Sequence, residues 1–325
     1  MHQTKILDIK INKITTEEVL EKIKGFLLSD KNSPPDKGAC LSGRQGWGVR
    51  NAEDKSQHHI ITLNPEMVVE ARKNDYFKKI INEASLVVAD GIGILLAIKF
   101  LEKNSPLDKG ACLSGRQGWG VEKITGINLI YKICEAEFIK NKKIYLLGAE
   151  EGIAEETAEV LSNKYSYLNI VGAEEGIRFE IPNTKYQIPN KIQNIKYQTA
   201  NKLPITNYQL PITSNNAESA ELNNKLIQKI NNARPDILFV AFGAPKQEVW
   251  IYENLKKMPT VKLAIGVGGS FDFISGKTRR APLIFQKLGL EWLWRLILEP
   301  RRIKRIYNAT VKFGWLILTK KREGL

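Results

Sequence analysis

The sequence is poor in the residues that build disulfides and metal centres. Its 325 residues include only three cysteines and three histidines. An odd number of cysteines argues against a disulfide framework, and the histidines stand in no metal-ligand spacing with cysteines or acids. No D-x-D pair of the kind that holds a divalent ion against a nucleotide diphosphate is present. We therefore expect neither a metal nor a cofactor, and any general base should be a carboxylate.

Long apolar runs are also missing. No stretch of about 18 apolar residues suggests a transmembrane helix. The N-terminal residues do not combine a basic start with an apolar run, so we expect no secretion signal. Together with the few cysteines, these absences predict a reduced, cytoplasmic protein.

Charge is unevenly distributed along the chain. The net charge is +14, and it is concentrated in four segments: two copies of a short repeat, residues 181–217, and the C-terminal residues 291–325. The remainder of the chain is neutral overall. A protein that bound nucleic acid through its main body would carry positive charge there, so we expect no nucleic-acid partner.

Apolar strands alternate with amphipathic helices along the chain. Such an order predicts an α/β fold with a Rossmann-like parallel sheet flanked by helices. The strands are expected at residues 4–11, 59–63, 85–90, 142–148, 168–172, 236–243 and 261–269. The helices are expected at residues 15–28, 64–73, 91–101, 126–139, 150–165, 220–233 and 245–255.

Three segments interrupt this order, at about 31–50, 103–121 and 181–217. The first two contain a 19-residue repeat that differs only at Pro35 and Leu107. Its glycines and arginine resemble a phosphate-binding loop, but it neither ends a predicted strand nor starts a predicted helix. The third segment is rich in prolines and has no helical or alternating apolar period. We interpret all three as insertions that form exposed loops within one domain, residues 1–290.

Polar residues follow several of the expected strands. Asn64 and Asp90 each close an apolar strand, and ligands of open parallel sheets bind beyond the carboxyl ends of strands. Each residue also has a purely structural interpretation. Asn64 is a good N-cap for a helix that starts with Pro65, and Asp90-Gly91 is a good strand-to-helix turn.

Two glycine-rich turns follow the last expected strands. The turn at Gly243 precedes a helix that carries Gln247 and Glu248, and a helix start suits an anion. The later turn carries Gly268 and Gly269 and is followed by two cations close to a proline. An ordinary tight turn would explain the first segment equally well, and a solvated basic turn is the alternative for the second. The two cations are Arg279 and Arg280.

The C-terminal residues 291–325 combine tryptophans with leucines, isoleucines, arginines and lysines. Aromatic and basic residues at helical spacing are typical of a helix that lies on an anionic membrane surface. We therefore expect a basic amphipathic, membrane-associating appendage. The alternative is a terminal helix that packs on the core and exposes a solvated face.

Seven stretches together resemble the WecG/TagA/CpsF family of bacterial glycosyltransferases. The resemblance runs from about Thr4 to Arg305 and skips the three inserted segments. The stretches are "TLNPEMVVEARKN", "LVVADGIGILLA", "KITGINLI", "KIYLLGAEEGIAEE", "ARPDILFVAFGAPKQEVWI", "AIGVGGSFDFISGKTRRAP" and "GLEWLWRLILEPRR".

The resemblance implies an inverting, metal-independent transferase. Such enzymes move an N-acetylmannosamine-type sugar from a UDP donor to undecaprenyl-diphosphate-linked GlcNAc, in cell-surface polysaccharide synthesis at the inner face of the membrane. It implies Asp90 as general base, Thr62 and Asn64 in the pocket, and Gln247 near the donor. It also suggests homo-oligomers and C-terminal arginines that close over the diphosphate and help to dock the enzyme on the membrane. Those arginines are Arg295, Arg301, Arg302 and Arg305; the other expected substrate-binding residues are Gly91, Glu248, Gly268, Gly269, Arg279 and Arg280.

Three other functions remain open from the sequence. Another UDP-sugar enzyme with a Rossmann fold would need a G-x-G-x-x-G turn after the first strand, and none is present there. A non-catalytic adaptor that uses the basic tail would leave Asp90 and Gln247 without a role. An inactive homologue is the third, because the repeat at 103–121 directly precedes "VEKITG", close to the expected chemistry.

Overall fold

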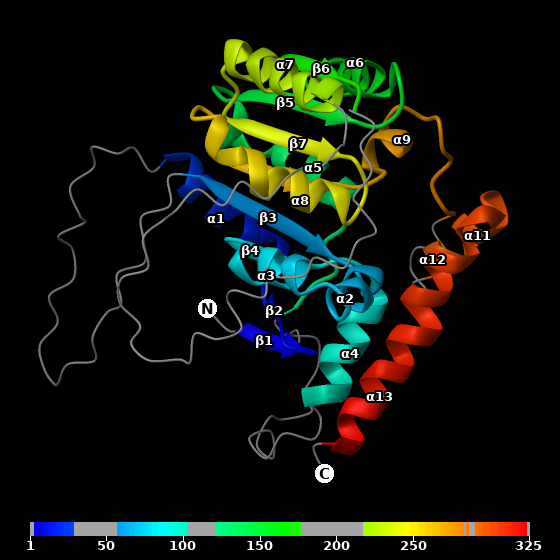
Figure 1. Cartoon of the computed structure of the whole chain (residues 1–325). Coiled ribbons are helices and arrows are strands. Elements are labelled where there is room, and N and C mark those ends of the chain that lie inside the picture. Colours follow the sequence, from blue (N-terminus) through cyan, green and yellow to red (C-terminus); the bar gives the residue numbers. More distant parts are fainter. Residues whose placement is uncertain are drawn as a thin grey trace, which may run out of the picture.

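A computed structural model describes residues 3–28, 57–102, 121–176, 217–282, 284–285 and 290–323. Its centre is a six-stranded sheet with the order β4-β3-β8-β7-β5-β6 (Figure 1). Every neighbouring pair in this sheet is parallel, which confirms the expected α/β fold. The strands are β3 (His58–Leu63), β4 (Leu86–Ala89), β5 (Lys143–Gly148), β6 (Asn169–Glu174), β7 (Ile237–Ala241) and β8 (Leu263–Gly266).

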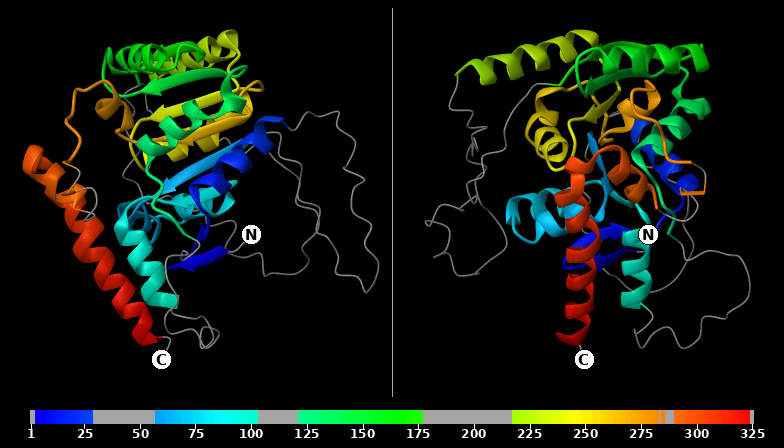
Figure 2. Two further views of the ribbon diagram at one scale, coloured as in Figure 1. Left: turned by 180° about the vertical axis from the view of Figure 1, so that it is seen from behind. Right: turned by 90° about the vertical axis from the view of Figure 1, so that its right-hand side faces the viewer.

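Helices cover both faces of the sheet (Figure 2). Adjacent residues of a strand point to opposite faces, so Ile60 and Ile61 of β3 belong to different clusters of buried side chains. One face packs on α1 (Thr16–Leu28), α5 (Gly126–Glu135), α6 (Ile153–Lys164) and α9 (Ser270–Ile274). The other packs on α2 (Pro65–Ala71), α3 (Asp75–Glu83), α4 (Ile92–Glu102), α7 (Ala217–Ala233) and α8 (Lys246–Asn254). The sheet is buried on both sides, which explains its continuous apolar strands.

The expected first strand, residues 4–11, is wrong as a single element. It forms an antiparallel hairpin of β1 (Gln3–Ile6) and β2 (Ile9–Asn12), separate from the main sheet. Leu7 and Asp8 have φ values of 50° and 67°, so they form the tight turn that reverses the chain. Alternation of apolar residues continues across that turn, which is why the sequence reads as one strand.

Two helices differ from the expected ones. Asn74 accepts a hydrogen bond from the backbone N–H of Phe77 and starts α3, a helix that the sequence pattern did not indicate. The expected helix 126–139 ends earlier, at Glu135, and a 3-10 turn, η2 (Glu137–Ile139), follows it.

The C-terminal residues form a chain of helical segments that crosses the carboxyl edge of the sheet and runs down beside α4 (Figures 1 and 2). Phe313 and Ile317 are buried against the cluster that includes α2 and α4. No helix in the described part of the chain has the length and apolar character needed to cross a membrane. The segments are α11 (Glu291–Leu298), η5 (Pro300–Arg302), α12 (Ile303–Tyr307), η6 (Asn308–Lys312) and α13 (Phe313–Glu323).

The three segments interpreted as insertions lie outside the described residues, apart from Val121 and Ala217 at their ends.

The hairpin is tied to the edge strand β4 by a buried side chain. Asn12 is 1% exposed, and its Oδ1 accepts a hydrogen bond of 2.8 Å from the backbone N–H of Val87. This hydrogen bond gives a partner to a backbone N–H of the edge strand that has no neighbouring strand to pair with on that side.

We predict that Asn12→Ala lowers the free energy of unfolding by about 1–3 kcal/mol, because it leaves the N–H of Val87 buried without this acceptor. Urea denaturation measures the change. Lys5→Ala, at an exposed position of the same hairpin, is the control and should have little effect. Equal losses in the two variants would contradict the role of the hydrogen bond.

Candidate active site

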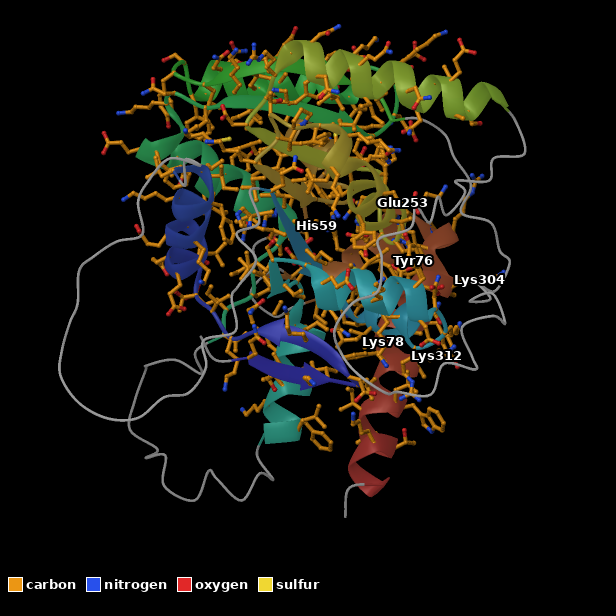
Figure 3. All side chains as sticks on the ribbon, turned by 60° about the vertical axis from the view of Figure 1, so that its left-hand side comes forward. His59, Tyr76, Lys78, Glu253, Lys304 and Lys312 are labelled. Carbon is orange, nitrogen blue, oxygen red and sulfur yellow. The ribbon has the colours of Figure 1, made fainter. Side chains whose placement is uncertain are left out.

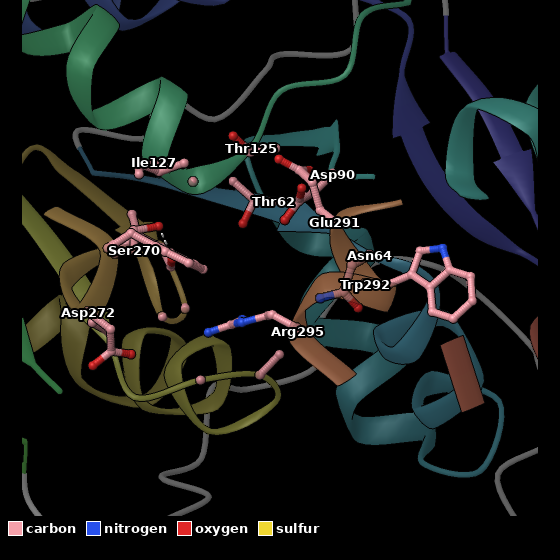
Figure 4. A pocket seen from close by; sticks show the side chains of 18 of the residues that line it. Thr62, Asn64, Asp90, Thr125, Ile127, Ser270, Asp272, Glu291, Trp292 and Arg295 are labelled. Carbon is pink, nitrogen blue, oxygen red and sulfur yellow. Dashed lines mark hydrogen bonds between the residues drawn. The ribbon is translucent and has the colours of Figure 1, made fainter. Parts of the chain in front are cut away.

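A pocket of about 400 Å³ lies at the carboxyl edge of the sheet (Figure 4). The residues that follow β3, β4, β7 and β8 form its floor, and the start of α5 forms one wall. Residues from α11 to α12 cover it, so the C-terminal segment completes the pocket. Parallel strands bring their carboxyl ends together, which is why residues far apart in the sequence meet here.

Asp90 stands on the floor, held by the edge of the sheet. Its backbone N–H donates to Leu63 O over 2.8 Å, and Ile124 donates to the carbonyl of the preceding Ala89 over 2.8 Å. Burial raises the pKa of Asp90 to about 7, and the nearby Glu291 carboxylate adds to the rise. Lys123 and Arg295 act in the opposite direction. A carboxylate with this pKa is suited to accept a proton near neutral pH.

Glu291 reaches Asp90 from the C-terminal segment. Its Oε2 lies 3.2 Å from Lys123 Nζ, and both side chains are largely shielded from solvent. Figure 4 shows the two carboxylates, Asp90 and Glu291, close to Thr125 on the same side of the pocket. The position of α11 therefore influences the protonation of Asp90.

Thr62 and Asn64 lie in the pocket, and both are also used structurally. Thr62 Oγ1 donates to Gly266 O over 3.0 Å, linking β3 to β8. Asn64 Oδ1 accepts from the N–H of Met67 over 3.0 Å, which confirms the expected N-cap of α2. Asn64 therefore lines the pocket and caps the helix at the same time.

Gln247 joins two loops at the pocket floor. Its Oε1 accepts the backbone N–H of Gly243 at 3.2 Å and that of Gly268 at 2.9 Å. Its Nε2 donates to Glu248 Oε1 over 2.7 Å, which fixes the orientation of the amide. A Cβ at Gly266 would lie 2.6 Å from Gln247 Nε2 and 2.8 Å from Glu248 Oε1, so glycine leaves room for both side chains.

Four arginines line the pocket, but they differ in their partners. Arg305 makes a two-pronged ion pair with Glu66, at 2.8 and 2.9 Å, and Arg302 pairs with Glu299. Arg280 donates to Asn128 Oδ1 over 2.9 Å.

Arg295 is the arginine best placed to receive an anion. Its guanidinium lies 4.7 Å from the ring centre of Phe273 and extends across the pocket (Figure 4). Within the described residues, its buried Nε donates no hydrogen bond. Burial lowers the pKa of Arg295, because a charged guanidinium is costly to desolvate, and the nearby Arg302 adds to the fall. Glu299, whose Oε1 lies 3.9 Å from Arg295 Nε, acts in the opposite direction.

Most of the predicted site residues meet at this pocket, but not all. Glu248 is fully buried behind Gln247 and does not line the pocket, and neither do Arg279 and Arg301, which are exposed. Gly91 lines a second, adjoining groove. The predicted residues that line the pocket are Thr62, Asn64, Asp90, Gln247, Gly268, Gly269, Arg280, Arg295, Arg302 and Arg305.

Several pocket residues were not predicted from the sequence. Thr125 is the N-cap of α5 and accepts from the N–H of Asn128, so its position in "KITG" was the available signal. Asp272 and Trp292 belong to the family-like stretches but had no distinguishing spacing. Burial raises the pKa of Asp272, with Lys277 and Arg295 opposing the rise.

The described histidines lie away from the pocket. The ring of His58 stacks on Phe26 at 3.7 Å, and His59 is buried in the sheet (Figure 3). Burial lowers the pKa of His59 to about 3, so it is neutral. Among the described residues, no three His, Cys, Asp or Glu side chains come together in a way that could hold a metal ion.

Glu248 generates a prediction about pH and stability. Burial raises its pKa from 4.5 to about 7, so the folded protein keeps a proton that the unfolded chain releases. The contribution of the protonated Glu248 side chain to the free energy of unfolding is therefore largest below pH 4.5, and it is lost as the pH rises towards about 7. We predict that Glu248→Gln, which stays neutral, raises the melting temperature at pH 8 relative to wild type more than at pH 5.

Differential scanning calorimetry at the two pH values measures this difference. Glu221→Gln, at an exposed position of α7, is the control and should show the same shift at both. If Glu248→Gln also behaves identically at pH 5 and pH 8, Glu248 is not protonated in the folded state.

Comparison with known proteins places the chain in a family. A model described as "Glycosyl transferase WecG/TagA/CpsF family" matches residues 46–324, which includes the C-terminal segment. A relative from Staphylococcus aureus (strain MRSA252) is 27% identical over 264 residues, covering 81% of each chain. A second, from strain NCTC 8325, is 26% identical over the same length and coverage. Both are named N-acetylglucosaminyldiphosphoundecaprenol N-acetyl-beta-D-mannosaminyltransferase. The match over most of its length shows that this chain belongs to the WecG/TagA/CpsF family of glycosyltransferases.

Proposed function

We propose that the protein transfers an N-acetylmannosamine-type sugar, with inversion, from a UDP donor to GlcNAc linked to undecaprenyl diphosphate. The names of the relatives support the acceptor and the sugar. The observation that carries the proposal is the half-buried Asp90, which shares one pocket with Arg295. An inverting transfer needs one base and one group that stabilises the leaving diphosphate.

Asp90 takes the role of the base. Its raised pKa keeps the carboxylate basic enough to remove the proton of the acceptor hydroxyl as that oxygen attacks the anomeric carbon of the sugar. The bond to the diphosphate then breaks on the opposite face of the sugar, and the electron pair leaves with UDP. One displacement inverts the anomeric centre.

Arg295 takes the role of stabilising the diphosphate. Its buried Nε donates no hydrogen bond within the described residues and lies 3.9 Å from Glu299 Oε1, whereas Arg302 and Arg305 make shorter ion pairs with Glu299 and Glu66. Gly269 lines the same pocket beside Arg295: a Cβ built on this glycine would lie 3.0 Å from a guanidinium nitrogen. Arginines can balance the developing charge without a metal ion, so we propose a metal-independent reaction.

We further propose that residues 291–325 form an appendage that holds the enzyme on an anionic membrane, at the inner face where the acceptor lies. Its outer surface exposes Tyr307, Val311, Trp315 and Leu318, which recur every three or four residues and so share one side. Lys304 and Lys312 lie on the same segment (Figure 3). Exposed apolar residues with nearby cations suit a membrane interface.

The experiment that tests the reaction is release of UDP from UDP-N-acetylmannosamine in the presence of a GlcNAc-diphosphate lipid. We predict that wild type turns over and that Asp90→Asn loses activity by a factor of about 100–10,000, because the amide cannot accept the proton. Wild-type activity should increase with pH through about 7, as Asp90 ionises.

Glu291→Gln distinguishes Asp90 from any other base. Removing the neighbouring charge lowers the pKa of Asp90, so the rise in activity should move to lower pH. Glu137→Gln, at an exposed site, is the matched control and should leave the profile unchanged. Unchanged turnover in Asp90→Asn would refute the mechanism.

If residues 291–325 hold the enzyme on an anionic membrane, the protein should bind anionic vesicles. We expect the double variant Val311→Asp, Trp315→Glu to float with phosphatidylglycerol vesicles at least tenfold less than wild type, because two apolar contacts are replaced by charges that the surface repels. Leu222→Asp, at an exposed leucine of α7, is the control. Equal flotation of all three proteins would reject the anchoring role.

A further inference from the structure

A second cavity, an apolar groove of about 710 Å³, lies beside the catalytic pocket. It runs between α4 and the C-terminal segment, which lie side by side in Figures 1 and 2. Its volume is within the range of roughly 300–1,000 Å³ found for ligand sites. The side chains of its walls include Ile92, Leu96, Phe100, Phe313, Ile317 and Leu318.

The apolar walls of the groove are incompletely covered. Leu96 and Leu318 are each 57% exposed, and Ile92 is 38% exposed. Exposed apolar side chains around a concave surface are more typical of a binding site than of a surface that contacts only water. The occupant indicated by this lining is apolar.

One end of the groove opens into the catalytic pocket. Asn64, Asp90, Glu291 and Trp292 line both cavities. A molecule in the groove therefore has one end within reach of the proposed base. Leu318 also lines the groove and, like the nearby Val311 and Trp315, is more than half exposed.

We propose that the groove binds the first isoprene units of the acceptor lipid, adjacent to its diphosphate. The inference rests on the proposed function, and it adds a site for a part of the substrate that does not react. The polar head of the acceptor would lie at Asp90 and the chain along α4 and α13, and the remainder would leave past Leu318 towards the bilayer. A sugar or a nucleotide would place polar groups against these apolar walls without hydrogen-bond partners. An isoprenoid chain would instead bury apolar surface against them.

Gly314 offers a way to block the groove without disturbing the fold. It lines the groove, and a Cβ built on it meets no atom within 4 Å. Leucine also favours a helix more than glycine does, so Gly314→Leu should not weaken α13. The matched control is Gly25→Leu, because Gly25 lies in α1, is outside both cavities and has equally open space.

The kinetic test compares two acceptors that share a GlcNAc-diphosphate head. One carries an undecaprenyl chain and the other a short alkyl chain. We expect Gly314→Leu to raise KM for the long-chain acceptor about tenfold, the effect of withdrawing roughly two methylene groups from an apolar site, and to change KM for the short-chain acceptor less than twofold. Gly25→Leu should match wild type with both. An unchanged KM for the long chain, or an equal rise for both acceptors, would overturn the proposal.

A second measurement does not depend on activity. A photoreactive farnesyl diphosphate analogue is cross-linked to the full-length protein, and the labelled residues are mapped by mass spectrometry. We expect labels within 92–100 and 309–318, reduced at least fivefold in Gly314→Leu. Labels elsewhere would overturn the groove assignment even if the enzyme transfers sugar. Labels in the groove of a protein that transfers no sugar would refute the proposed function and leave the groove assignment standing.

A second copy of the chain is the competing occupant of an apolar groove. Sedimentation velocity of wild type and Gly314→Leu separates the two cases. If the substitution dissociates an oligomer while leaving both KM and labelling unchanged, the groove is a chain–chain contact and the lipid proposal is wrong.

Discussion

The side-chain amide of Gln247 sets the geometry on which the rest of the site depends. One oxygen accepts two backbone N–H groups, from Gly243 and Gly268, and so holds the loops after β7 and β8 at a fixed separation. Those loops form the floor beneath Arg295. Because Gln247 Oε1 is already occupied, the residue acts mainly by positioning the backbone, and Glu248 keeps the amide from rotating.

The site is built by two parts of the chain that are distant in sequence. The sheet supplies Asp90, the proposed base, whereas the C-terminal segment supplies Glu291, which raises the pKa of Asp90, and Arg295, which is proposed to bind the diphosphate. A pocket of this kind is complete only when α11 lies across the sheet edge. The ion pair between Arg305 and Glu66 is one contact that holds the segment there, and it joins α12 to the start of α2.

Residues with strong local signals were predictable, and residues placed by tertiary contacts were not. The Asn64 cap and the buried parallel strands follow from short-range rules, and Asp90 could be found because strand ends converge. Glu248 lies in the same motif as Gln247, but only Gln247 lines the pocket, and the sequence motif does not show this difference. The hairpin at Leu7 and Asp8 was missed because the turn contains no glycine and a positive φ is uncommon for a residue such as Leu7.

Residues 122–124 are tied to the core by backbone and side-chain hydrogen bonds. Glu122 donates its N–H to Ile14 and accepts from Thr16 through its carboxylate, and Ile124 donates to Ala89. These bonds hold Lys123 and Thr125 beside Asp90. Residues 122–125 are thus tied to the start of α1 on one side and to β4 on the other, so one wall of the pocket inherits its position from the sheet edge and from a helix that covers one face of the sheet.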